Sequence, residues 1–366
     1  MKIAFLGPVS PFRGGIAQFL QNMAANLAVG HEVVVYSFLR QYPRIFFPGK
    51  DQYEKSQQKY NFEIKRVLTP YNIFTWRKAA KSIIADAPDH LIIKFWIPFF
   101  CPAYIYLTRY LKKHSNIKIS MLCHNIDFHE KWLFAEFFVK KMLQKVEKVI
   151  VLSGNVYYQA LKHKDKQDVV RLFHPLYEVN LSYYKRETSL KNLNIPNKPT
   201  ILFLGYIKPY KGLETLIKAI PIINKTLPDA QFVVAGEAYY EIEMPTELPC
   251  LIYHNKYIPQ SLLPHYFTIA DVVVVPYRSA TQSGIILLAY SYLKPVIASN
   301  INGLKEFVTE HKSGLLFEKE NENDLAEKII SFLQENRSHY VEDIKELNKK
   351  YTWEKFTENL IEALND

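Results

Sequence analysis

The chain has 366 residues, a length typical of two domains of ordinary size. With 48% hydrophobic and 22% charged residues and no tandem repeat or low-complexity tract, the composition is that of a globular protein with enough apolar material for two cores. The net charge of +10 is concentrated in residues 1–180, which suggests an anionic surface or ligand on that side: nucleic acid, lipid headgroups or a lipid-diphosphate acceptor.

Three cysteines, Cys101, Cys123 and Cys250, lie far apart in the sequence. Their odd number and spacing predict neither a disulfide framework nor a metal site, which favours a reducing cytoplasm. The apolar run Ile3–Leu6 is too short for a signal peptide and predicts a first strand. The apolar stretch Phe95–Thr108 is shorter than the roughly 20 residues of a spanning helix, so we expect a strand end, a loop and a helix there.

Short β-branched runs alternate with helical segments along the first half, which favours parallel sheets built from βαβ units. The expected helices include Ile16–Leu27 and Trp132–Val146. The expected strands are Ile3–Gly7, His31–Phe38, Glu63–Leu68, Leu91–Trp96, Lys118–His124, Lys148–Leu152 and Val169–Phe173.

A polar segment, Glu178–Lys198, then interrupts the alternation and predicts a linker with a short helix. Beyond it the pattern restarts, with helices such as Gly212–Asn224 and Ile285–Tyr292 and a final amphipathic helix, Tyr351–Leu364. The expected strands are Thr200–Gly205, Gln231–Gly236, Leu251–Tyr257, Val272–Pro276, Pro295–Ser299 and Gly314–Phe317.

These patterns predict an α/β protein with two Rossmann-like, doubly wound domains: residues 1–180 with the returning helix 351–366, a linker 181–198, and residues 199–350. Such domains bind ligands at the carboxyl ends of their strands, so a cleft between the two is the expected site. The pattern alone does not choose between a transferase, an epimerase and a dehydrogenase.

Two lysines follow the first strand of the second half, in the segment Gly205-Tyr-Ile-Lys208-Pro-Tyr-Lys211-Gly212. Lys208 and Lys211 fall in a strand-to-helix turn, at the positive end of a helix dipole. Ammonium and backbone N–H groups in such a turn suit a diphosphate. The simpler interpretation, two solvated loop lysines, is equally compatible with this segment.

A second polar turn, made of Thr281, Gln282, Ser283 and Gly284, follows the strand at Val272–Pro276 and opens a helix. Its hydroxyl and amide groups suit ligand hydroxyls, and Gly284 allows the backbone to approach a ligand closely. An ordinary helix N-cap is the alternative.

In the first half, the segment Cys123-His124-Asn125-Ile-Asp127-Phe-His129-Glu130 lies just past a buried strand. Its density of polar residues makes His124 the best candidate there. Asp127 and Glu130 also fit capping of the next helix, and the spacing does not predict a metal site.

The pair Gly14 and Gly15 follows the first strand and opens a helix. The segment is not G-x-G-x-x-G, so a dinucleotide fingerprint is absent. Paired glycines still suit a loop that passes close to a ligand.

Taken in order, these segments resemble glycosyltransferase family 4, a group of retaining enzymes with the GT-B fold, over nearly the whole chain. The likeness is strongest from Gly205 to Glu306 and rests on FLGYIKPYKGLETLI, FVVAGE, YIPQSLLPHYFTIADVVVVPY and PVIASNINGLKEFV. The closing segment YTWEKF resembles the C-terminal helix that returns to the first domain in this family.

The resemblance implies roles for individual residues. His124 matches the histidine that faces the donor sugar, and Gly14 and Gly15 match the glycine-rich loop near the diphosphate and acceptor. Glu306 matches the glutamate of a family turn that contacts the donor. It also implies a base site at Tyr257 and Ile258 and a diphosphate site at Lys208, Lys211, Ser283 and Gly284.

The chain departs from the family pattern in two respects. Tyr206 stands where the family has an arginine, so Lys208 is expected to supply that charge. The two family glutamates would fall at Ala280 and Leu288, and no Asp or Glu occurs between Asp271 and Glu306. We therefore expect ribose and sugar hydroxyls to be held by Thr281, Gln282 or Ser283, or by backbone groups.

The function implied by the resemblance is retaining transfer of a hexosyl group from a UDP- or GDP-linked sugar to a glycan or lipid-linked glycan, as in cell-surface polysaccharide or lipopolysaccharide synthesis. Lys211 and His124 are the expected catalytic residues, because a departing diphosphate demands positive charge and the sugar must be oriented. Front-face retention needs no protein nucleophile, and neither a metal nor a cofactor is expected. The absence of an obvious carboxylate pair agrees with this.

The acceptor is expected on the basic first half. The segment Lys131–Lys148 contains four aromatic residues, Trp132, Phe134, Phe137 and Phe138, and, towards its end, the four lysines Lys140, Lys141, Lys145 and Lys148. Lys112, Lys113 and His114 add to this positive charge. This predicts peripheral attachment to the inner face of the membrane and a polyprenyl-diphosphate-linked acceptor. A core-packed helix with a solvated lysine face is an equal alternative.

Three other functions remain open at this point. A nucleotide-sugar 2-epimerase shares the fold, but would require carboxylates in the cleft. An NAD-dependent oxidoreductase is disfavoured because no glycine fingerprint follows either first strand. A non-catalytic binding protein is disfavoured because the basic residues form no recognised nucleic-acid module, so nucleic acid is not an expected partner.

Overall fold

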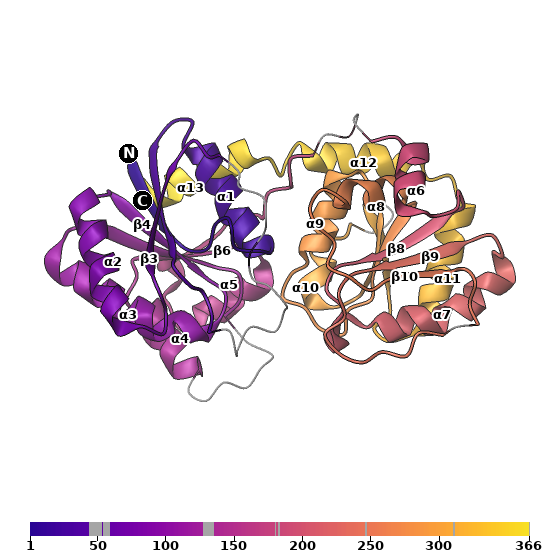
Figure 1. Cartoon of the computed structure of the whole chain (residues 1–366), viewed down its shortest axis with the longest axis horizontal. Coiled ribbons are helices and arrows are strands. Elements are labelled where there is room, and N and C mark those ends of the chain that lie inside the picture. The colour runs from indigo at the N-terminus through magenta and orange to yellow at the C-terminus, as the bar shows by residue number, and fades with distance from the viewer. Residues whose placement is uncertain are drawn as a thin grey trace. The chain divides into compact units, whose positions relative to one another are not determined.

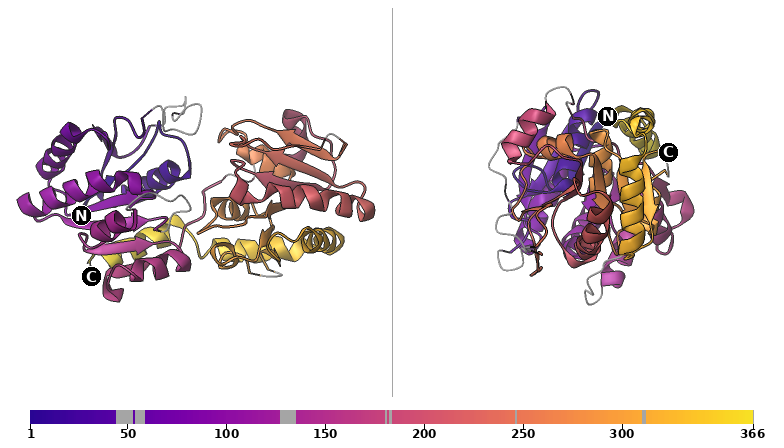
Figure 2. Two further views of the ribbon diagram at one scale, coloured as in Figure 1. Left: turned by 90° about the horizontal axis from the view of Figure 1, so that it is seen from below. Right: turned by 90° about the vertical axis from the view of Figure 1, so that its right-hand side faces the viewer.

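The computed structural model describes residues 1–43, 53, 59–126, 135–179, 181, 184–245, 247–309 and 312–365. The chain divides into two compact units, and both chain ends lie in unit 1 (Figure 1). Unit 1 comprises Met1–His174 and Trp353–Asp366, and unit 2 comprises Pro175–Thr352. Each unit holds one parallel sheet with helices on both faces, so the predicted fold class is confirmed (Figure 2).

The sheet of unit 1 has seven parallel strands in the order β3-β2-β1-β4-β5-β6-β7. The order reverses between β1 and β4, which is the switch point where doubly wound sheets bind ligands. The elements of this unit are β1 (Lys2–Leu6), α1 (Gly15–Leu27), β2 (Glu32–Phe38), β3 (Glu63–Leu68), α2 (Ile73–Asp86), β4 (His90–Phe95), α3 (Cys101–His114), β5 (Lys118–Cys123), α4 (Ala135–Leu143), β6 (Lys148–Val151), α5 (Gly154–Leu161), β7 (Val169–Arg171) and α13 (Trp353–Asn365).

Two helix layers cover this sheet because successive strand residues point to opposite faces. In β4, Leu91, Ile93 and Phe95 join the core formed with α2, α3, α4 and α5. Ile92 joins the opposite core, which is formed with α1 and α13. Helix α13 reaches that core through Trp353 and Phe356, whose ring centroids lie 5.3 and 5.8 Å from that of Phe19 on α1.

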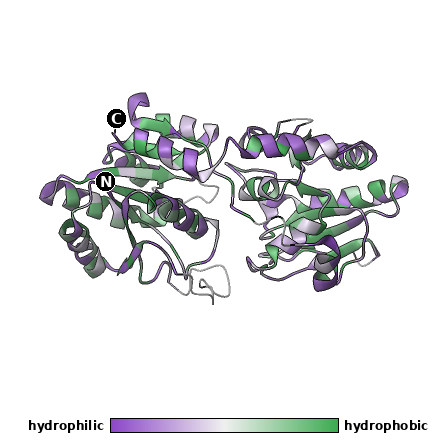
Figure 3. Ribbon diagram, turned by 90° about the horizontal axis from the view of Figure 1, so that it is seen from above, coloured by the Kyte–Doolittle hydropathy of each residue, from purple (hydrophilic) through white to green (hydrophobic). Residues whose placement is uncertain are grey.

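The sheet of unit 2 has six parallel strands in the order β10-β9-β8-β11-β12-β13, with its switch point between β8 and β11. Hydrophobic residues fill the strands, while the helices also carry hydrophilic residues (Figure 3). The elements are α6 (Arg186–Leu193), β8 (Thr200–Leu204), α7 (Leu213–Thr226), β9 (Gln231–Ala235), β10 (Leu251–His254), α8 (Leu263–Ile269), β11 (Val272–Val275), α9 (Gly284–Ser291), β12 (Val296–Ser299), α10 (Asn302–Lys305), β13 (Gly314–Phe317), α11 (Glu322–Gln334) and α12 (Ser338–Asn348).

Helix α6 lies within the segment 181–198, for which the sequence predicts a linker. It packs against α8, and the Arg186 guanidinium donates to the carbonyl oxygens of Ile269 (2.7 Å) and Lys198 (3.0 Å). This segment is therefore anchored to unit 2 by hydrogen bonds to its backbone.

Each strand that the sequence predicts is present, usually one or two residues shorter. The stretch Phe95–Thr108 contains the end of β4, a tight turn at Pro98–Phe100 and most of α3, as its length and prolines predict. Of the predicted helix Trp132–Val146, the structure describes α4, and residues 131–134 lie outside the described residues. No helix in the described ranges is long and apolar enough to span a membrane.

Candidate functional site

The loops that follow β8 and β11 meet at the switch point of unit 2, because these two strands pair directly. The backbone N–H of Arg278 donates to the carbonyl oxygen of Tyr210 at 2.7 Å. The Arg278 guanidinium also donates to the carbonyl oxygen of Pro209 at 3.1 Å and lies 2.8 Å from a carboxylate oxygen of Glu320. Arg278 thus fixes the loop after β8 against its own loop, a role that sequence reasoning missed.

Glycine is required where these loops pass each other. Gly212 has a φ of 63° and precedes α7, and a Cβ atom built on it would lie 2.1 Å from the carbonyl oxygen of Pro276. No larger residue fits this close approach.

Lys211 points into the switch point and is only 9% exposed. Its Nζ atom would lie 3.2 Å from a Cβ atom built on Gly205, and it lies 5.2 Å from the centroid of the Tyr277 ring. Burial lowers the pKa of Lys211, partly offset by the nearby Tyr210. The simpler interpretation, a solvated loop lysine, is therefore wrong for Lys211.

Lys208 belongs to an aromatic cluster beside this point. Its Nζ atom lies 5.5 Å from the centroid of the Tyr239 ring. Tyr206 packs edge-on against Tyr239 with 5.2 Å between centroids, and its centroid lies 6.3 Å from that of Tyr257. The cluster therefore joins loops after β8, β9 and β10, next to the partly buried Ile258.

The sequence pattern marks Tyr206 only as standing in place of the family's arginine, and it does not mark Tyr239 as a site residue. The adjacent tyrosines Tyr239 and Tyr240 just past β9 were the available signal.

The polar turn before α9 leaves the start of that helix without a side-chain cap. Ser283 occupies the N-cap position, but its hydroxyl makes no capping hydrogen bond. Ser283 is 3% exposed and lies near the hydroxyl of Tyr277. Burial raises the pKa of Tyr277 to about 12, and the nearby Ser283 lowers it in part. Thr281 and Gln282 are half-buried and Gly284 is exposed. Because Ser283 does not cap α9, the ordinary N-cap interpretation does not account for this turn.

The loop after β12 contacts the same turn. A Cβ atom built on Gly303 of α10 would lie 1.9 Å from the carbonyl oxygen of Ala280. Glu306 is the exposed residue at the C-terminal end of this short helix. In unit 2 the structure thus brings Lys211, Ser283 and Gly284 to one switch point, with Lys208, Tyr257 and Ile258 on the β9 and β10 side.

In unit 1, Gly14 is the N-cap residue of α1, with a φ of 102°, and Gly15 is its exposed first residue. His124 follows β5, and its backbone N–H donates to the carbonyl oxygen of Phe95 at 3.0 Å. Its imidazole is 4% exposed and packs edge-on against Phe19, with 5.1 Å between centroids. Burial, Lys94 and His174 all lower the pKa of His124, so the neutral imidazole predominates at neutral pH.

Lys94 and His174 are the neighbours of His124 that sequence reasoning missed. The ring centroids of the two histidines are 6.2 Å apart. Lys94 is 1% exposed, and its Nζ atom has no hydrogen-bond partner among the described residues. Burial holds the pKa of Lys94 well below its usual value.

Several candidates of this segment fall outside the described residues: Asp127, His129, Glu130, Trp132 and Phe134. Within the described ranges, no group of three or more His, Cys, Asp or Glu side chains is arranged to hold a metal ion.

Residues 185–364, most of unit 2 together with α13, match the family model described as "Glycosyl transferases group 1". This part of the chain is therefore similar to a group 1 glycosyltransferase domain. The uncharacterized glycosyltransferase MJ1178 of Methanocaldococcus jannaschii is 34% identical to the chain over 164 residues, which cover 42% of the chain and 44% of that protein. The putative glycosyltransferase YtcC of Bacillus subtilis is 28% identical over 249 residues, which cover 61% of the chain and 60% of that protein. The chain thus spans about half the length of the curated relatives that it matches.

Solved structures resemble the whole chain. HepE of Anabaena, in complex with UDP, has a TM-score of 0.74 and 14% identity, with 100% of both chains covered. Sucrose-phosphate synthase of Thermosynechococcus elongatus has a TM-score of 0.71 and 17% identity, with 100% of this chain and 98% of that chain covered. At such identities the likeness concerns the fold alone, which is that of two Rossmann-like domains of the GT-B type.

Proposed function

We propose that this chain is a retaining glycosyltransferase of family 4. It transfers a hexosyl group from a UDP- or GDP-linked sugar to a glycan or lipid-linked glycan acceptor in cell-surface polysaccharide synthesis. The observation that carries this proposal is the buried Lys211 ammonium beside Gly205 and the uncapped start of α9 at the switch point of unit 2.

This switch point suits the diphosphate of a nucleotide sugar. Lys211 supplies positive charge, and the backbone N–H groups at Ser283 and Gly284 supply fixed donors near the start of α9. Charge accumulates on the diphosphate as the glycosidic bond to it breaks, and preorganised donors in a buried site stabilise that charge most effectively. Lys208 lies in the same loop after β8 and adds to the same field.

The remaining donor groups follow from the aromatic cluster and the polar turn. Tyr257 and Ile258, next to Tyr206 and Tyr239, hold the base. Thr281, Gln282 and Glu306 hold ribose and sugar hydroxyls in place of the family glutamates. The supporting relatives include HepE, solved with UDP-glucose, and a 41.2 kDa protein in the cps region of Klebsiella pneumoniae, which is 22% identical over 253 residues.

Unit 1 contributes the acceptor side of the reaction. The neutral imidazole of His124 orients the sugar by a hydrogen bond, and the Gly14–Gly15 turn lets the backbone approach the diphosphate or acceptor. The reaction needs neither a metal nor a cofactor beyond the nucleotide sugar. We place the protein in the cytoplasm, at the inner face of the membrane.

Thermal unfolding of the full chain with UDP, GDP, UDP-glucose and GDP-mannose tests the donor site. A nucleotide that binds only the folded protein raises the melting temperature. We expect one nucleotide series to do so, and Lys211→Ala to abolish the rise. Lys218→Ala, an exposed lysine on α7, should leave the rise unchanged.

Product analysis then distinguishes the activities. Transfer of sugar to an added acceptor supports the proposal, whereas isomerised nucleotide sugar without transfer identifies a 2-epimerase. No rise with any nucleotide, or an equal rise in Lys211→Ala, would overturn the assigned donor site.

A further inference from the structure

The same short pattern occurs near the start of two helices of unit 1. Residues 74–78 read FTWRK in α2, and residues 137–141 read FFVKK in α4. In each segment an exposed phenylalanine precedes a basic pair by one helical turn, at spacings of three and four residues that share a helix face. Phe74 is 84% exposed and Phe137 is 57% exposed.

Both segments lie at the same edge of the first sheet. Helices α2, α3 and α4 lie side by side on one face of that sheet (Figure 1). Helix α2 follows β3, so it starts at the carboxyl edge of the parallel strands. Helix α4 leads into β6, so its end lies at the amino edge and its start points to the carboxyl edge. The two phenylalanines therefore project from one edge, with one helix between them.

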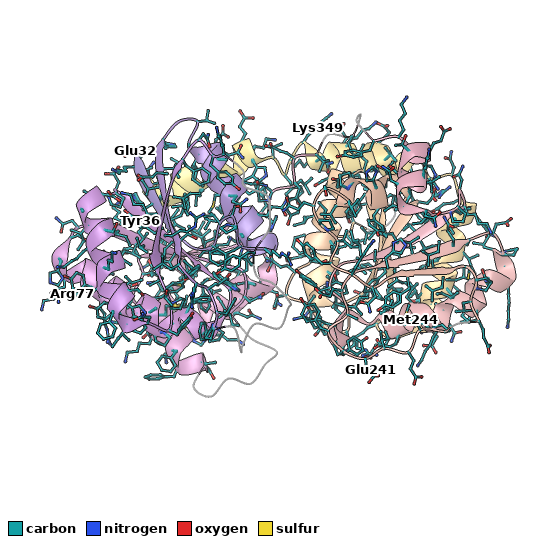
Figure 4. The ribbon with its side chains drawn as sticks, viewed as in Figure 1. Glu32, Tyr36, Arg77, Glu241, Met244 and Lys349 are labelled. Carbon is teal, nitrogen blue, oxygen red and sulfur yellow. The ribbon has the colours of Figure 1, made fainter. Side chains whose placement is uncertain are left out.

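The surface behind these phenylalanines is basic. Arg77, Lys78 and Lys81 are exposed on α2, and Arg77 extends away from the sheet (Figure 4). On α4, Lys140 is exposed and the Nζ atom of Lys141 lies 5.2 Å from the centroid of the Phe137 ring. The intervening α3 contains no acidic residue, and the single acidic residue of α2, Asp86, is paired with Lys65. Helix α4 carries one acidic residue, the exposed Glu136 in its first turn, against its two lysines Lys140 and Lys141.

We propose that the two segments Phe74–Lys78 and Phe137–Lys141 form a docking surface for a membrane rich in anionic phospholipid. The phenylalanines enter the boundary of the acyl chains, and the basic pairs one turn behind them meet the lipid phosphates. Ile73, which is 62% exposed, adds apolar surface next to Phe74.

A membrane fits these segments better than a protein or a nucleic acid. Lysine is depleted at protein interfaces, whereas lysines near a membrane surface attract anionic lipid. A nucleic acid would neutralise the basic pairs but would leave Ile73 and Phe74 in water. Two separate anchors on one unit also fix its orientation, with the carboxyl edge of the sheet towards the lipid.

Only the purpose of this surface depends on the proposed function: it would bring the acceptor side of unit 1 to a lipid-linked acceptor. Its existence is testable without any substrate. We would measure sedimentation of the full chain with vesicles of phosphatidylcholine alone and with about one-third phosphatidylglycerol. We expect binding only to the anionic vesicles, weakened by salt.

Four variants separate the two contributions. Arg77→Glu with Lys78→Glu, and Lys140→Glu with Lys141→Glu, should each weaken binding at least about tenfold, because each removes two lipid-facing charges. Phe74→Ser and Phe137→Ser should each weaken it severalfold. The matched controls are Lys218→Glu with Lys225→Glu on α7, and Val29→Ser, whose side chain is also 84% exposed but lies beyond α1.

Equal binding to both vesicle types, or unchanged binding by the paired charge variants, would overturn the proposal. Loss with the charge variants but not with either phenylalanine variant would also overturn it, and would indicate a soluble polyanion. The thermal shift with nucleotide should persist in all four variants, because none of the substituted residues belongs to the proposed donor site. A failure here is thus distinct from a failure of the donor site.

Discussion

The Nζ atom of Lys94 lies 3.6 Å from the centroid of the Phe19 ring. Lys94 is on β4 and Phe19 on α1, so the side chain crosses the core at the switch point of the first sheet. The structure gives this nitrogen the face of an aromatic ring and no hydrogen-bond partner among the described residues. His124 and His174 pack against the same ring, so three basic side chains share one buried position.

We expect Lys94→Met to stabilise the protein at pH 7. Burial holds the pKa of Lys94 in the folded chain well below its ordinary value of 10.5. At a pH between the pKa of the folded chain and that of the unfolded chain, Lys94 therefore binds a proton only in the unfolded chain. Stability therefore rises with pH through this range, and methionine removes the cost, worth about 1–3 kcal/mol. Urea unfolding at pH 7 and pH 10 should show a gain that shrinks at the higher pH. A variant that is less stable than the parent at pH 7 would contradict this account.

Nucleotide affinity should fall as the pH rises through the lowered pKa of Lys211. Burial lowers the pKa of Lys211 in the free protein, whereas a bound diphosphate would favour the charged ammonium. Binding then takes up a proton, and affinity falls by up to about tenfold per pH unit above the free pKa. Calorimetric titration with the binding nucleotide from pH 7 to pH 9.5 measures this slope. Lys218→Ala should keep the slope, and a slope in Lys211→Met equal to that of the parent would disprove its assignment to Lys211.

Gly303→Ala should damage the donor site and the fold together. Its Cβ atom would lie 1.9 Å from the carbonyl oxygen of Ala280, so the turn before α9 must move. We expect a loss of about 1–3 kcal/mol in the free energy of unfolding and weaker nucleotide binding. Gly30→Ala is the matched control, because nothing lies within 4 Å of the added atom. If Gly303→Ala matches this control in both measurements, the close packing of α10 on the turn is wrong.

Asp271→Ala should destabilise the protein without weakening nucleotide binding. Its carboxylate accepts from the backbone N–H of Thr200 at 2.7 Å and lies 3.3 Å from the guanidinium of Arg337. These contacts lie at the amino ends of β8 and β11, opposite the proposed donor site. Loss of a half-buried carboxylate with such partners costs about 2–4 kcal/mol. Chemical unfolding and nucleotide titration test this beside Asp229→Ala, an exposed aspartate; weaker nucleotide binding would contradict a purely structural role.

Most strands were predictable from sequence because they are short apolar runs, and many of these are buried on both faces. Val272–Val275, between Asp271 and Pro276, is one such run. The loops after β8 and β11 were predictable as neighbours, because strand order in doubly wound sheets brings the carboxyl ends of adjacent strands together. Lys211 could therefore be predicted as a site residue, although its burial could not be predicted.

Other contacts could not be predicted because they join distant segments. Tyr206, Tyr239 and Tyr257 come from three different loops, and each looks like an ordinary tyrosine in its own segment. Lys94 lies in an otherwise apolar strand, where a lysine would suggest an exposed edge strand and not a buried central one. Helix α6 was expected within a linker because its apolar periodicity is weak, and hydrogen bonds from Arg186 supply part of its attachment.

Unit 1 is built from two stretches of chain that are separated by the whole of unit 2. During synthesis, residues 1–174 leave the ribosome well before Trp353 and Phe356 are made. Until then, Phe19 and the face of the sheet around it lack their cover. A nascent chain that stops before α13 therefore leaves this apolar face uncovered, and we expect such a chain to expose it to chaperones and proteases.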